Sequence, residues 1–417
     1  MAKSEDAKER KMWLWISIII NLGFLGIFKY YDFFVESFAN ALSQIGVQVN
    51  SWTLNVILPV GISFYTFHGL SYVFDIYRDK IKPEQNIIDY GVFVSFFPLL
   101  VAGPIERATH LLPQIKVQRS FNYDKAVDGM RQILWGLFKK IVIADNCAEF
   151  SNLIFDHSSE YSGIILIVGA ILFAFQIYGD FSGYSDIAIG TAKLFGIDLL
   201  RNFSFPYFSR DIAEFWRRWH MSLTSWFRDY LYIPLGGSHV GTWKKIRNTF
   251  IIFLVSGFWH GANWTFIAWG ALHAIYFLPL LLLNKNRQNL SIVAQNKNLP
   301  TIREFIGMSC TFGLTTVAWI FFRANNMEHA IQYLSSIFSS DHLPLRIIPD
   351  TILVFDYYLT ILFVILFIFY EWFQREKKHG LQLTENHPVR NWIVYLGLAT
   401  IIILFGGSQQ DFIYFQF

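Results

Sequence analysis

The 417-residue sequence contains few charged residues. Asp, Glu, Lys and Arg make up 16% of it, whereas soluble domains have about 25%. Hydrophobic residues make up 53% and aromatic residues 18%, so intrinsic disorder is excluded for the bulk of the chain. The formal net charge is only +3, and the basic residues are scattered among aromatic ones, which argues against nucleic acid as a partner. The composition instead predicts one polytopic membrane protein in contact with lipid.

Cysteine and the common catalytic motifs are also scarce. Cys147 and Cys310 are the two cysteines, too few for a disulfide framework or a zinc site. There is no G-x-S-x-G elbow, no Walker loop and no H-E-x-x-H signature. We therefore expect no metal and no permanently bound cofactor. No fixed-period repeat and no Pro/Gly/Ser-rich linker divides the sequence, so residues 1–417 are predicted to form a single membrane domain.

Long stretches without charge are what the sequence does contain. A helix needs about 20 mostly apolar residues to cross the hydrocarbon core of a membrane. Together with shorter apolar runs, these stretches predict an all-α fold with about nine or ten transmembrane helices, and with re-entrant or interfacial helices around a central cavity. The longest are Ser37–Phe74, Tyr161–Gly179, Asn248–Asn284 and Asn391–Gln410. The Asn248–Asn284 stretch has room for two spans, and Gly261-Ala262-Asn263 is the expected break between them.

The polar start of the chain, residues 1–11, suggests an orientation. It carries Lys3, Lys8, Arg10 and Lys11, and the positive-inside rule places such a segment in the cytoplasm. The basic segment Gln374–Arg390 is expected on the same side.

Two segments are too polar to be ordinary spans. Arg210–Leu231 has aromatic and apolar residues at helical spacing, and Glu214 and Arg218 are spaced to pair. We expect one helix that lies at the interface or dips into a cavity, or else an ordinary amphipathic surface helix. Its predicted aromatic face consists of Phe215, Trp219, Leu223, Trp226 and Tyr230.

The second polar segment, Gln176–Gly190, contains Ser182 and two carboxylates, Asp180 and Asp186. Carboxylates at membrane depth usually face a cavity, so both are predicted to line one or to orient a histidine. The alternative is a loop at the membrane surface.

His260 is the strongest candidate for catalysis. It lies in the motif SGFWHGANW, between Gly257 and Gly261, in the longest apolar region. Burial disfavours the charged form of an imidazole, and a neutral ring can act as a general base. Asn263 is predicted to line the adjoining cavity. The alternative for His260 is a hydrogen bond to a neighbouring helix.

The other apolar histidines and the basic patch give weaker signals. His220 is a candidate for binding or orienting an acyl donor, or for an interfacial role, while His68 and His273 are predicted to be structural. The patch Lys244, Lys245 and Arg247 suits the phosphates of an acyl-thioester donor, or anionic lipid, which is the commoner partner.

Several of these motifs together resemble the membrane-bound O-acyltransferase family. They resemble its alginate O-acetyltransferase branch more than its teichoic-acid D-alanyltransferase branch. The segments that carry the resemblance are FFPLLVAGPIER (Phe96–Arg107), QIYGDFSGYSDIAIG (Gln176–Gly190), FWRRWHMSLTSWFRDYLYIPLGG (Phe215–Gly237), SGFWHGANWTFIAWG (Ser256–Gly270) and FIYFQF (Phe412–Phe417).

The resemblance implies a ring of membrane helices around a narrow core, with the catalytic region over residues 176–284. It matches the family's catalytic histidine to His260 and its second histidine to His220. It implies a multi-pass protein of the bacterial inner membrane that takes acetyl from cytoplasmic acetyl-CoA. Arg217, Arg218, Lys244 and Lys245 would bind this donor. Extracytoplasmic partner proteins would help to deliver the acetyl group to an exported polysaccharide.

Two readings without this chemistry stay open. Intramembrane ionisable residues and broken helices also occur in transporters and flippases, although we see no inverted repeats. A scaffold of a polysaccharide-secretion complex is the other alternative.

Overall fold

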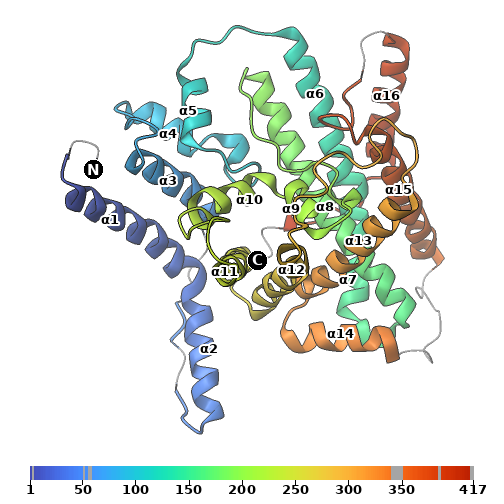
Figure 1. Ribbon diagram of the computed structural model, residues 1–417. Coiled ribbons are helices and arrows are strands. Elements are labelled where there is room, and N and C mark those ends of the chain that lie inside the picture. Colours follow the sequence, from blue (N-terminus) through green and yellow to red (C-terminus); the bar gives the residue numbers. More distant parts are fainter. Residues whose placement is uncertain (2–3, 50–51, 55–58, 340–350, 384–386, 414–417) are drawn as a thin grey trace.

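The computed structural model describes the chain except residues 2–3, 50–51, 55–58, 340–350, 384–386 and 414–417 (Figure 1). The described residues form helices joined by loops, as the composition predicts. The α-helices are α1 (Ala7–Leu25), α2 (Tyr31–Gln44), α3 (Ile62–Tyr77), α4 (Ile87–Val94), α5 (Ala108–Lys116), α6 (Tyr123–Leu137), α7 (Asp145–Asp156), α8 (Gly163–Leu194), α9 (Ile212–Arg218), α10 (Met221–Phe227), α11 (Thr242–His260), α12 (Trp264–Leu282), α13 (Ile302–Arg323), α14 (Met327–Ser339), α15 (Thr351–Gln374) and α16 (Pro388–Leu404). The π-helical turns are η1 (Gly26–Tyr30), η3 (Phe138–Ala144) and η6 (Arg228–Tyr232), and the 3-10 turns are η2 (Phe97–Leu99), η4 (Ser158–Glu160) and η5 (Pro206–Phe208).

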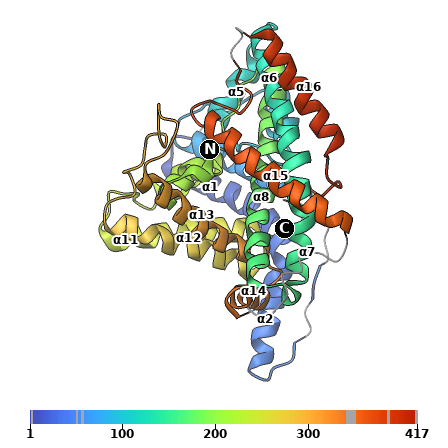
Figure 2. The same cartoon turned by 90° about the vertical axis from the view of Figure 1, so that its right-hand side faces the viewer.

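Helix α8 forms the centre of the molecule (Figure 2). It is 32 residues long and packs against α6, α7 and η3 on one side. On another side, α13 contacts α8, α12 contacts α13, and α11 contacts α12. The alternative interpretation of Gln176–Gly190 as a surface loop is wrong, because this segment lies inside α8 with most of its side chains buried.

Helices α11 and α12 form the predicted pair with a break between them. The backbone of Gly261 is extended, which ends α11, and the Asn263 side chain caps α12 by accepting a hydrogen bond from Thr265 N at 3.1 Å. The two helices approach closely at glycine: a Cβ on Gly257 would lie 2.2 Å from the main-chain oxygen of Phe266. This contact fixes the register of α11 against α12, and therefore the position of His260 along the helix pair.

Five segments of the described chain are long and apolar enough to span a membrane. They are Ala7–Gln44, Gly163–Leu194, Trp264–Leu282, Ile302–Arg323 and Phe355–Gln374. Ile87–Leu99 and Pro388–Leu404 are shorter apolar helical segments. This is fewer than the nine or ten predicted spans, because most of the other helices are shorter and α11 carries Lys244, Lys245 and Arg247. The part of Ser37–Phe74 at residues 50–51 and 55–58 lies outside the described residues.

The segment Arg210–Leu231 is not the single helix that its spacing predicts. It forms α9, then α10, and continues as η6, with a break at Trp219 and His220. The backbone of His220 is left-handed, with φ of 43°, so a right-handed helix cannot continue through it. Two main-chain hydrogen bonds to a neighbouring loop hold the break, Ser204 N to Arg218 O and Met221 N to Asn202 O.

Candidate active site

The break between α9 and α10 brings the His220 side chain into the core. The residue has no solvent exposure, and its ring lies against Phe181 of α8, with ring centroids 4.7 Å apart. The left-handed backbone costs energy for a residue with a side chain, and such strain clusters at functional sites. This placement of His220 therefore suits a functional residue better than an interfacial one.

His260 comes to the same place from the end of α11. The rings of His220 and His260 have their centroids 6.4 Å apart and planes at 56°, and His260 is 5% exposed. The two candidates that the sequence singles out on different helices thus share one site.

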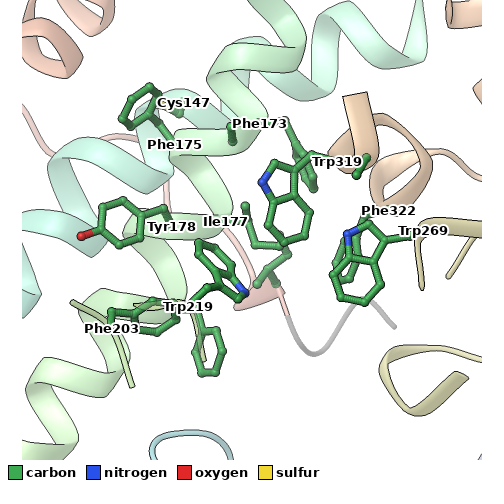
Figure 3. Packing of buried hydrophobic residues seen from close by; sticks show 14 of the residues in the cluster. Cys147, Phe173, Phe175, Ile177, Tyr178, Phe203, Trp219, Trp269, Trp319 and Phe322 are labelled. Atoms are coloured by element: carbon green, nitrogen blue, oxygen red, sulfur yellow. The ribbon is translucent and has the colours of Figure 1, made fainter. Parts of the chain in front are cut away.

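Aromatic rings surround this pair. The centroids of Trp259, Trp269 and Phe322 lie 4.8, 5.1 and 5.4 Å from that of His260. In Figure 3, Trp269, Trp319 and Phe322 gather on one side of the core, and Trp219 lies beside Phe203. Such a wall excludes water and lowers the local dielectric constant, which strengthens any charge interaction within it.

Some polar atoms in this aromatic wall have no protein partner. Within the described part of the chain, both ring nitrogens of His220 and the indole nitrogen of Trp269 are buried and form no hydrogen bond. An unsatisfied buried polar group costs about 1–3 kcal/mol. Groups left in this state in a well-packed protein are candidates for binding a reacting molecule.

A polar pocket of about 580 Å³ opens beside His260. Asn263 lines it as predicted, together with Gly261, which follows His260, and Phe322, which contacts the His260 ring. The Asn263 amide also donates to Asn325 O at 2.8 Å. The remaining lining residues are Asn152, Asp156, Ala262, Phe266, Arg323, Ala324 and Asn325.

A second pocket, of about 480 Å³, follows α11 from Thr249 to Ser256, one turn before His260. Its wall is mainly apolar and includes Leu223, Phe227, Phe253 and Phe277. Three arginines, Arg217, Arg228 and Arg287, also line it. The second pocket therefore borders α11 before His260, and the polar pocket borders the break that follows His260.

The four predicted donor-binding cations differ in their surroundings. Arg217 lines the second pocket and donates to the main-chain oxygens of Asn286 and Asn289 at 2.8 and 2.9 Å. Arg218 forms the predicted pair with Glu214, at 2.8 Å. Lys244 is exposed and Lys245 is half-buried on the first turn of α11, and neither lines this pocket as described.

The two carboxylates of α8 lie in an ionic cluster. Asp180 binds Lys140 at 2.9 Å and accepts from Ile413 N at 2.7 Å. Asp186 pairs with Lys139 and accepts from the Gln132 amide at 2.7 Å. In the described structure these partners are not histidines. No contact there supports the prediction that Asp180 or Asp186 orients a histidine. Asp186 does line a small polar pocket with Lys139 and Arg201.

The two histidines predicted to be structural have partners inside the protein. Glu106 N donates to His68 Nε2 at 3.3 Å, and the Trp216 indole donates to His273 Nδ1 at 3.2 Å. Among the described residues, no group of three or more His, Cys, Asp or Glu side chains is arranged to hold a metal ion.

Sequence reasoning missed Trp269 and the arginines Arg228 and Arg287. Trp269 is one of 14 tryptophans, and nothing in its local sequence separates it from the others. Arg228 lies in the same polar segment as Arg217, and Arg287 comes from the loop after α12, so only the folded chain brings all three to one pocket.

Comparison with known proteins agrees with the motifs. Residues 78–311, which include both site histidines, match the model of the membrane-bound O-acyltransferase family. The chain is 38% identical over 327 residues to a probable alginate O-acetylase of Pseudomonas aeruginosa, covering 78% of this chain and 60% of that protein. It is 36% identical over 430 residues to a probable alginate O-acetylase of Pseudomonas putida, covering 98% and 85%. It is 34% identical over 449 residues to a peptidoglycan O-acetyltransferase of Helicobacter pylori, covering 98% and 83%.

Proposed function

Because this chain belongs to the membrane-bound O-acyltransferase family, we propose that it transfers acetyl from acetyl-CoA to hydroxyls of an exported cell-surface polysaccharide. Family membership and five long apolar helices make it a multi-pass membrane protein. We place it in the bacterial inner membrane by analogy with its relatives. The observation that carries the proposal is the buried His220–His260 pair. One pocket lies along α11 before His260, and another lies at the break after it.

The donor enters through the pocket lined by Arg217, Arg228 and Arg287. Guanidinium groups bind phosphates through several N–H donors, and the apolar wall behind them suits the pantetheine arm of CoA. Lys244 and Lys245 attract the donor phosphates from the surface, while Arg218 acts through its pair with Glu214.

This entrance lies on the side of the chain's start, which we take as cytoplasmic. Arg10 binds Asp79 at 2.8 Å, and the neighbouring Arg78 donates to Asp229 O at 3.0 Å. Asp229 follows Arg228 of the pocket. The acceptor hydroxyl enters through the other pocket, past Asn263 and Gly261.

His260 acts as the general base in this mechanism. It removes the proton from the acceptor hydroxyl as the oxygen attacks the thioester carbonyl carbon. The tetrahedral intermediate then expels the CoA thiolate, and His260 gives the proton from the acceptor hydroxyl to this thiolate. Within the described residues the Trp269 indole N–H forms no hydrogen bond, so it is available to the developing oxyanion, and His220 orients the donor or the acceptor.

The test uses purified protein with labelled acetyl-CoA and an oligosaccharide acceptor. We expect His260→Ala to lower acetyl transfer by about 10²–10⁴-fold, which is the usual contribution of a general base. Membrane abundance should be unchanged. His387→Ala, at an exposed histidine before α16, is the matched control. Full activity of His260→Ala would rule out the role of this residue.

An experiment in cells identifies the acceptor polysaccharide. Ester-linked acetate on surface polysaccharides should disappear in a deletion strain and in a strain carrying only His260→Ala. The polymer that loses acetate is the acceptor. Uptake of a labelled glycan into vesicles without cleavage of acetyl-CoA would favour a transporter instead.

A further inference from the structure

Lys29 is a lysine inside the first apolar segment of the chain. It lies in the π-helical turn η1, between α1 and α2, within the candidate span Ala7–Gln44. A charged side chain in a membrane segment is costly, and it usually marks a functional position with a defined partner. π-helical turns are likewise frequent at functional sites.

The partners of Lys29 are main-chain oxygens at the end of α11. Its ammonium donates to Trp259 O at 2.9 Å and to His260 O at 3.0 Å. The adjacent Tyr30 stacks on Phe258, with ring centroids 4.1 Å apart. Lys29 and Tyr30 therefore contact the last turn of α11, which carries His260.

The hydrogen bonds from Lys29 satisfy carbonyl groups at the C-terminus of α11. The last carbonyl groups of a helix have no partner inside it, and α11 ends at His260 because the next backbone, at Gly261, is extended. A lysine at a helix C-terminus satisfies such carbonyls and interacts favourably with the negative end of the helix dipole. Here the lysine comes from a different helix, so it also fixes the last turn of α11 relative to α1.

We propose that Lys29 is a positioning residue for acyl transfer, which holds His260 through its main chain. This inference rests on the proposed function. Lys29 lies outside residues 78–311, the part of the chain that matches the family model. It does not line the proposed donor pocket, which follows α11 at Thr249–Ser256. Its loss therefore disturbs the geometry of the base and leaves donor binding intact.

The experiment compares Lys29→Met, Lys29→Arg and Lys29→Gln with the unaltered full-length protein. A displacement of a reacting group by about 1 Å costs on the order of 100-fold in rate, so Lys29→Met should lower kcat by roughly 10–100-fold. The KM for acetyl-CoA should stay unchanged. Lys29→Arg keeps a cation with several donors and should restore kcat to within about tenfold of the unaltered protein. Lys11→Met is the matched control, because Lys11 is an exposed lysine of α1, with no bond to α11.

Hydrogen–deuterium exchange locates the effect. Amide exchange in the last turn of α11 should rise in Lys29→Met, and exchange in α8 should not. A Lys29→Met protein with normal kcat would overturn the proposal, as would an equal loss in Lys29→Met and Lys29→Arg at normal protein abundance. If Lys29→Met does not accumulate, Lys29→Arg decides, since a kcat more than about tenfold below that of the unaltered protein would also overturn the proposal. Lys29→Gln keeps an N–H donor but loses the charge, so it shows whether the charge is needed.

His260→Ala separates this failure from failure of the proposed function. An active His260→Ala protein contradicts the acyl-transfer mechanism itself. An inactive His260→Ala protein beside a fully active Lys29→Met protein contradicts the role of Lys29 alone.

Discussion

The histidine site and the ionic cluster of α8 bury polar groups in opposite ways. In the cluster, Lys139 and Lys140 face Asp186, Asp180 and Asp145, and each charge has a partner. The histidine site holds imidazole and indole nitrogens among aromatic rings, and some of these atoms form no hydrogen bond within the described chain. Paired charges hold helices together, whereas under the proposed function the groups without a described hydrogen-bond partner bind the substrate. The comparison predicts that mutations in the cluster change stability and mutations at the site change rate.

The largest expected effect on stability is at Lys139, which is 3% exposed. Lys139→Ala leaves the Asp186 carboxylate without its cation, and breaking a buried pair costs about 3–5 kcal/mol. Thermal unfolding in detergent, with activity counted per folded molecule, measures both sides of the comparison. The control is Lys125→Ala, which breaks the more exposed pair with Asp198 and should cost less than about 1 kcal/mol. Equal stability of the two variants would contradict the distinction.

Trp269→Phe makes the opposite change, because it removes the indole N–H and keeps a ring. Loss of one oxyanion donor lowers kcat by about 10²–10³-fold. The amount of folded protein should stay the same. Trp264→Phe, at a 55% exposed tryptophan of the same helix, should retain full activity. If Trp269→Phe turns over normally, this N–H has no part in the reaction.

Asp180→Asn sharpens the comparison, since the sequence had suggested that this carboxylate serves a histidine. Asparagine keeps an oxygen acceptor for Ile413 N but loses the charge opposite Lys140. The expected cost is about 1–3 kcal/mol of stability, with normal kcat per folded molecule. A lower kcat at unchanged stability would show that the Asp180 carboxylate takes part in the reaction.

The smallest effect concerns Asp128 in α6, outside the candidate spans. A hydrogen bond from His379, with a further one from Lys193, lowers the pKa of the Asp128 carboxyl well below its usual range. A lowered pKa means that the contribution to stability is present above the ordinary aspartate pKa of about 3.9 and is lost as the pH falls. Asp128→Asn should cost roughly 1 kcal/mol at pH 7, after allowance for its partial exposure.

Unfolding at pH 7 and near pH 3 measures this contribution. The difference between the two pH values should be smaller in Asp128→Asn than in the unaltered protein. An identical pH dependence in both proteins would show that the pair adds no stability.

Local sequence was sufficient wherever neighbouring residues decide the structure. The sequence Gly261-Ala262-Asn263 predicted the break between α11 and α12, and the spacing of Glu214 and Arg218 predicted their pair. It failed at His220, because aromatic residues continue at helical spacing through Trp219. The chain turns there because loop residues Asn202 and Ser204 bind its main chain, and no local pattern reports that contact.

The carboxylates of α8 show the same limit. Their depth in the membrane predicted a cavity, since an isolated charge needs water. Asp186 does line a small pocket, but Lys139 and Lys140 also supply the opposite charge to both carboxylates, and only the packing of η3 against α8 brings them there.

The sequence by itself determined the membrane environment and the family, and it singled out His220 and His260 as candidates, because composition and motifs need no knowledge of distant contacts. The tertiary structure decided that His220 and His260 share one aromatic site, that the Trp269 N–H forms no hydrogen bond to any described residue, and that Lys29 caps the helix of His260. These features depend on the register between helices. Close backbone contacts such as that of Gly257 with Phe266 set this register, and it arises only when the whole chain has packed.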